Sequence, residues 1–180
     1  MTKFMTTEIA ARLDETEDLD ILELPYTDEG RSMIVFLPKE SSYKIVDSIL
    51  QYPVQDMKNI PQAMTTVSIP SFKINYKMKL KPIMNTLGVY DMFSESANFS
   101  YISSLPLKVS EGIHNAFIEV NEEGAEAAAA TMSLFSFKSS GGQKRFFANK
   151  PFYFMVYDFD NQLPIFMGKF STPQHKSKLV

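Results

Sequence analysis

Apolar residues gather in short runs separated by polar turns, a pattern typical of strands with a few short helices. The runs at 21–26 (ILELPY) and 32–38 (SMIVFLP) flank an acidic, glycine-containing turn and predict a β-hairpin. The aromatic runs at 151–159 and 164–170 predict two further strands. Residues 1–20 are polar with weak periodicity, so we expect the first firm element only at residue 21.

Two short helices are expected between these strands. Over residues 41–53, apolar positions recur at helical spacing behind two serines that can cap a helix, and Pro53 closes the pattern. The second helix has Pro82 near its first turn and Gly88 at its end.

Two other segments have strand character. Residues 67–76 alternate between apolar and polar, but the apolar phase shifts around Pro70. This shift predicts a strand with a local irregularity, because proline cannot donate a ladder hydrogen bond. Strand character returns over residues 107–119. Because the strands are grouped with a few short helices and do not alternate with them regularly, the sequence predicts an α+β fold.

Composition places the chain among globular proteins and excludes several kinds of site. Of its 180 residues 44% are hydrophobic, and a net charge of -3 provides no overall positive field for nucleic acid. No apolar stretch approaches the roughly 18 residues that span a membrane. The chain has no cysteine and only two histidines, His114 and His175, so we expect no thiol nucleophile and no Cys- or His-rich metal site. We expect neither a cofactor nor an enzyme active site.

The stretch 125–131 (AEAAAAT) allows two structural interpretations. Its alanines have high helix propensity, which favours a surface helix. The stretch lacks an apolar stripe to dock such a helix, however, and it is too short to be a stable helix alone. The second interpretation is a mobile strand that slips between two others, with Gly124 as the hinge and Glu126 on the solvated face. Alternation then places only small residues inward, namely Ala125, Ala127, Ala129 and Thr131.

The segment VNEEGAEAAAAT, residues 120–131, resembles the proximal hinge of inhibitory serpins, with Glu122, Glu123 and Gly124 in family order. FFANKPFYFMV, residues 146–156, resembles the C-terminal signature of that family. Shorter matches, among them ILELPY, IPSFKI and LGVYDMF, follow the serpin order. The resemblance implies the C-terminal half of a serpin, with mainly antiparallel sheets, a few short helices and a long exposed reactive-centre loop.

The resemblance also implies a domain organisation and a mechanism. Residues 1–173 would be a partial serpin domain with its reactive-centre loop at about 122–150, and residues 174–180 a C-terminal tail. Serpins are suicide substrates of serine proteases: the protease cuts the loop, which then inserts into the large sheet as an extra strand. Half of that sheet precedes the first matching residue in the family, so we expect a fragment that does not inhibit alone.

Family spacing places the cut between Lys138 and Ser139, counted from the first hinge glutamate. A lysine there implies a trypsin-like protease, whose primary pocket holds a carboxylate. Phe137, one residue earlier, would imply a chymotrypsin-like protease. Because the stretch after the cut is slightly longer than in familiar members, Lys144 and Arg145 remain alternative cut sites.

Other residues have secondary interpretations. His114 matches a histidine that serpins keep beneath the main sheet, which implies a structural role and not a general base. Asn98 begins an NFS acceptor triplet for N-glycosylation. The family suggests secretion, whereas residues 1–13 lack the apolar middle of a signal peptide, which leaves a cytoplasmic location open. The local basic cluster consists of Lys73, Lys77, Lys79 and Lys81. We interpret it as a solvated charged face in preference to a site for a heparin-like polyanion.

The alternative function is that of a non-inhibitory serpin-fold carrier, chaperone or interaction module. Such members often carry bulky, charged or proline residues in the hinge, and the inward positions of this hinge have none. An independent enzyme is not supported, because no nucleophile motif accompanies the two distant histidines. The sequence therefore favours inhibition of a serine protease.

Overall fold

The computed structural model describes residues 3–27, 30–40, 45–121 and 144–171. The chain divides into two compact units, one of residues 1–72 with 120–180 and the other of residues 73–119. Within the described ranges strands dominate and the helices are short, so the predicted α+β class is confirmed. None of the described helices is long and apolar enough to cross a membrane.

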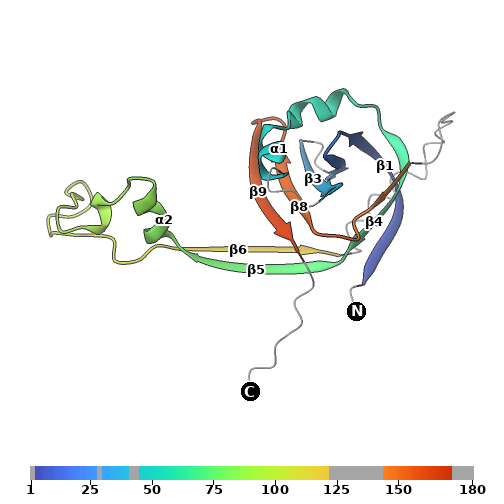
Figure 1. Cartoon of the computed structure of the whole chain (residues 1–180). Helices are drawn as coiled ribbons and strands as arrows, with labels where there is room; N and C mark the ends of the chain where they lie inside the picture. Colours follow the sequence, from blue (N-terminus) through green and yellow to red (C-terminus); the bar gives the residue numbers. More distant parts are fainter. Residues whose placement is uncertain (1–2, 28–29, 41–44, 122–143, 172–180) are drawn as a thin grey trace, which may run out of the picture. The chain divides into compact units, whose positions relative to one another are not determined.

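The first unit is built around a seven-stranded sheet with the strand order β7-β4-β1-β2-β3-β8-β9 (Figure 1). Neighbouring strands are antiparallel except β4 and β7, which run parallel. β7 and β9 are therefore the edge strands of this sheet. The strands span Phe4–Glu15 (β1), Leu19–Pro25 (β2), Arg31–Pro38 (β3), Ala63–Pro70 (β4), Lys144–Phe147 (β7), Phe152–Asp158 (β8) and Leu163–Phe170 (β9).

The predicted hairpin is confirmed as β2 and β3, and the two aromatic runs as the antiparallel pair β8 and β9. β3 is buried at every position from Ser32 to Pro38. A strand buried on both faces reads as a continuous apolar run, which explains why SMIVFLP does not alternate.

The expectation that residues 1–20 hold no firm element is wrong. β1 is the longest described strand, with twelve residues. It changes partner midway, because Ala11 pairs with β4 whereas Arg12 pairs with β2. Ile9, Ala10 and Ala11 are all buried beside this change. Both faces of β1 are covered there, so the alternation that would reveal a strand is lost.

One face of the sheet is covered by α1 (Ile45–Gln51) and the 3₁₀ helix η1 (Val54–Asn59), which confirms the first predicted helix. Elsewhere in this unit, Phe72 packs among three phenylalanines of β8 and β9, with ring centroids 5.1 to 5.9 Å apart. The cluster beneath the helices comprises Leu19, Ile21, Ile34, Phe36, Ile45, Ile49, Val54, Met57, Met155 and Tyr157.

The predicted strand at 67–76 is in fact two strands in different sheets. β4 ends at Pro70, the Ser71 amide donates to the Lys3 carbonyl oxygen at 2.9 Å, and β5 begins at the next residue. β5 (Phe72–Lys79) pairs with β6 (Ile113–Val120). The phase shift at Pro70 thus marks a change of sheet and not a bulge within one strand.

The second unit contains the β5–β6 ribbon and the segment that connects its strands. The predicted second helix is confirmed as α2 (Leu80–Thr86), and Gly88 follows it with a φ of 84°. A short 3₁₀ helix, η2 (Asp91–Phe93), comes next. β6 begins only at Ile113, so the strand predicted from residue 107 is shorter than expected.

Candidate functional site

Most of the predicted reactive-centre loop lies outside the described residues. The structure describes the strands on either side of it: β6 ends at Val120 and β7 begins at Lys144. β7 belongs to the first unit and β6, as far as Glu119, to the second, so each strand is described within its own unit. The predicted residues outside the described ranges are Glu122, Glu123, Gly124, Ala125, Ala127, Ala129, Thr131, Phe137, Lys138 and Ser139.

β7 is anchored in the seven-stranded sheet. It pairs in parallel with β4, and Phe146 turns inward with only 3% of its surface exposed. The ammonium of Lys144 donates to the carbonyl oxygen of Leu13 at 3.4 Å. The alternative cut sites Lys144 and Arg145 thus lie in a paired strand, inside the range 122–150 expected for the loop.

β6 leads directly into the predicted hinge. In the described part of the chain it pairs only with β5, which leaves its second edge open. The ammonium of Lys73 on β5 lies 3.0 Å from Oε2 of Glu119 and 5.9 Å from the ring centroid of Phe117. These contacts tie the end of β6 to β5 just before the hinge begins. His114 is exposed on β6, and the structural role implied for it stays a prediction.

The basic cluster is partly compensated by carboxylates. Lys79 pairs with Glu111 at 3.2 Å, as Lys73 does with Glu119. The ammonium of Lys81 lies 5.7 Å from the ring centroid of Phe93. Two of the four lysines therefore already have an acidic partner, which favours a solvated charged face over a site for a polyanion.

Across the described ranges, no group of three or more His, Cys, Asp or Glu side chains is placed to hold a metal ion. Asn98, the start of the glycosylation triplet, is exposed, and its Oδ1 accepts a hydrogen bond from the Ser100 amide at 3.1 Å.

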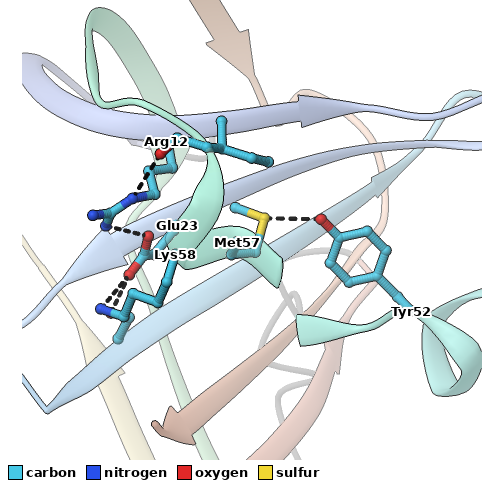
Figure 2. Close-up of polar contacts among 7 residues, drawn as sticks. Arg12, Glu23, Tyr52, Met57 and Lys58 are labelled. Carbon is cyan, nitrogen blue, oxygen red and sulfur yellow. Dashed lines mark hydrogen bonds and ion pairs between the residues drawn. The ribbon is translucent and has the colours of Figure 1, made fainter. Parts of the chain in front are cut away.

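A buried carboxylate that sequence reasoning missed joins β1, β2 and β3 to η1 (Figure 2). Glu23 is fully buried, and its Oε2 lies 2.8 Å from Nη1 of Arg12. Its Oε1 accepts from the Ser32 hydroxyl at 2.7 Å and from the Lys58 ammonium at 3.2 Å. Nε of Arg12 donates to the Ile60 carbonyl oxygen at 2.9 Å. The available signal was a glutamate inside the otherwise apolar run 21–26 (ILELPY).

These contacts determine the direction in which the pKa of Glu23 is shifted. Burial by itself raises the pKa of Glu23, but hydrogen bonds from Ser32 and Arg12 and the positive charges of Arg12 and Lys58 outweigh it, so this pKa is lowered. Nearby, the Tyr52 hydroxyl donates to Oδ2 of Asp14 at 2.7 Å, and burial together with that carboxylate raises the pKa of Tyr52.

A protein-family model described as serpin (serine protease inhibitor) matches residues 1–173 of this chain. The chain belongs to the serpin family. An uncharacterized serpin-like protein of Methanosarcina mazei is 38% identical over 172 residues, covering 91% of this chain and 40% of that protein. A serine protease inhibitor of Cyanea capillata is 36% identical, covering 94% of this chain and 46% of that protein.

Solved serpin structures agree with this assignment. Manduca sexta serpin-12 superposes with a TM-score of 0.76 at 25% identity, covering 96% of this chain and 46% of that one. Uncleaved ovalbumin gives a TM-score of 0.74 at 27% identity, covering 96% and 48%. The expected partial serpin fold is thus confirmed. This serpin chain spans less than half the length of these relatives and solved structures.

Proposed function

We propose that residues 122–143 of this serpin chain belong to the reactive-centre loop of a suicide-substrate inhibitor of serine proteases, cut between Lys138 and Ser139. The observation that carries the proposal is the run of small residues that continues directly from β6, whose second edge no described strand occupies. Small inward side chains let such a segment pair beside β6 without steric conflict or burial of charge. The lysine supports a trypsin-like target.

The loop acts first as a substrate. The serine oxygen of the protease attacks the carbonyl carbon of Lys138, the amide bond to Ser139 breaks, and the Ser139 nitrogen leaves as a new amino terminus that stays attached to β7. Lys138 remains esterified to the protease and continuous with β6. Folding back at Gly124 then lays the loop antiparallel beside β6.

The position of β7 supports Lys138 over the alternative cut sites. A substrate must leave its own sheet to extend across the cleft of a protease. Lys144 and Arg145 would have to break their pairing with β4 to do so, whereas Lys138 precedes β7 by six residues. We therefore place the cut in the segment between the two anchoring strands.

The proposed domain covers residues 1–173, with a tail at 174–180. Among the described strands β6 pairs with β5 alone, so a loop inserted beside β6 would have β6 as its one neighbour within the described ranges. We expect this chain alone to be cut without forming a lasting adduct, since one-sided pairing leaves the inserted strand an open edge.

Limited digestion with trypsin tests the proposal. The first cut is expected after Lys138, giving two fragments whose masses identify the bond, without an adduct that survives SDS. Lys138→Ala should remove this first cut and leave slower cuts elsewhere unchanged. A first cut after Lys144 or Arg145 would reject the assignment of Lys138. A lasting adduct from this chain alone would show that one neighbouring strand is enough. A longer form that is cut at Lys138 yet never traps trypsin would favour the non-inhibitory alternative.

A further inference from the structure

The outer face of the sheet beside the proposed loop has a regular cross-strand order. Arg145 on β7 pairs with Thr66 on β4, which pairs with Glu8 on β1. Phe147 pairs in the same way with Ser68, which pairs with Thr6. Because side chains two residues apart in a strand share a face, both rows lie on one surface. We call this surface the β7 face and define it by Phe4, Thr6, Glu8, Thr66, Ser68, Arg145 and Phe147.

The β7 face includes residue types that are enriched at protein interfaces. Phe147 is 51% exposed and Phe4 39% exposed, and their ring centroids lie 5.3 Å apart. A hollow of about 490 Å³ lies on this face, lined by Glu8, Thr66, Ser68, Arg145, Phe146 and Phe147. Aromatic residues and arginine are enriched at protein interfaces and among the residues that dominate binding energy. Lys144 is not part of the β7 face, because side chains alternate along a strand and its ammonium donates to the Leu13 carbonyl oxygen.

Chain connectivity brings this face next to the proposed cut. Only residues 139–143 separate Lys138 from β7. Fully extended, five residues span about 17 Å. One side of a standard protein interface buries about 800 Å², equivalent to a disc of about 16 Å radius. Because about 17 Å is the upper limit of the separation between Ser139 and Lys144, the near end of β7 lies no farther from the cut than about the rim of such an interface.

We propose that the β7 face is a second contact surface for the protease that cuts the loop, with Arg145 and Phe147 as specificity-determining residues. This inference rests on the proposed function. The chemistry of the face selects a protease with carboxylates opposite Arg145 and an apolar patch opposite Phe147, on the side of the cleft that receives the leaving peptide. Lys138 then sets the class of protease, and the β7 face selects among proteases of that class.

The test uses the full 180-residue chain and three trypsin-like proteases whose surfaces beside the leaving-peptide side are acidic, neutral and basic. The measured quantity is kcat/KM for appearance of the fragment that ends at Lys138. Arg145→Glu should lower it about tenfold for the acidic protease and raise it for the basic one, because the sign of the contact reverses. Phe147→Ser should lower it for all three.

Lys169→Glu is the matched control, since it makes the same charge change on β9, the other edge strand of the sheet. It should change each rate less than twofold. If kcat/KM for Arg145→Glu stayed within twofold of the value for the unmodified chain with every protease, the inference would be overturned and the proposed function would stand. An unmodified chain that none of the three proteases cuts after Lys138 would overturn the proposed function instead.

Discussion

At the scale of single residues, Glu23 is the side chain whose environment has the clearest consequence for stability. Its carboxylate is fully buried and has three donors, Arg12, Ser32 and Lys58. Removing one partner of a buried ion pair leaves the charge of the other partner buried and uncompensated. We expect Glu23→Gln to lower the free energy of unfolding by about 3 kcal/mol, measured by urea denaturation at pH 7. Lys58→Met should cost less, because Lys58 is 35% exposed and water can replace its contact.

The lowered pKa of Glu23 fixes the direction of the pH dependence. The folded pKa lies below the unfolded one, so the carboxylate contributes stability that is fully present above the unfolded pKa, about 4.3, and is lost as the pH falls through the folded pKa. The stability difference between the unmodified chain and Glu23→Gln should therefore shrink in that acidic range. A difference that stayed constant from pH 7 to pH 3 would contradict this assignment.

The proposed loop can be inferred from local sequence, whereas the buried cluster cannot. The inward positions proposed for the loop follow from alternation within a single segment. The Glu23 cluster draws its donors from β1, β3 and η1, which are far apart in the sequence. No local pattern indicates which of these polar residues will meet.

At the scale of elements, the sequence predicts strands well where one environment covers the whole strand. β2, β3, β8 and β9 each keep the same neighbouring strands along their length, and their apolar runs are plain. β1 was missed because its partner changes from β4 to β2 between Ala11 and Arg12. The break between β4 and β5 was detected at Pro70, but the phase shift could not distinguish a bulge from a change of sheet.

The packing of β8 on β9 depends on one glycine. A Cβ added at Gly168 would lie 2.3 Å from Cζ of Phe154. The Phe154 ring is buried between Phe72 and Phe166, with centroid distances of 5.4 and 6.3 Å, and has little room to move. We expect Gly168→Ala to destabilise the chain by about 3 kcal/mol in urea denaturation.

Two further variants distinguish the clash with the Phe154 ring from a general effect of replacing a glycine on stability. Adding Phe154→Leu to Gly168→Ala should recover part of the lost stability, because the clashing ring is removed. Gly112→Ala is the control, since the atom nearest to its added Cβ would be Cβ of Leu80, at 3.2 Å. If Gly168→Ala and Gly112→Ala cost the same, the Phe154 ring would not be the cause.

At the scale of the whole molecule, the proposed insertion of the loop should depend on which face of the inserted strand each residue occupies. Ala127 is expected to point inward and Ala128 outward, although the two residues are chemically identical and adjacent. An arginine at the inward position would have to bury its charge beside β6, whereas one at the outward position stays in water. Ala127→Arg and Ala128→Arg make the same substitution on opposite faces of the inserted strand. Any difference between the two variants therefore reports the effect of the face.

The experiment needs a chain that can accept the loop on both sides. A chimera serves, in which this chain replaces the segment of the Cyanea capillata inhibitor that it matches. The unmodified chimera should form an SDS-resistant adduct with trypsin. Ala127→Arg should be cut at Lys138 at the same rate but release trypsin, because cleavage precedes insertion and only insertion is blocked. Ala128→Arg should still trap the protease. If Ala127→Arg also trapped trypsin, side-chain size on the inward face would not control insertion, and the proposed alternation of the loop would be wrong.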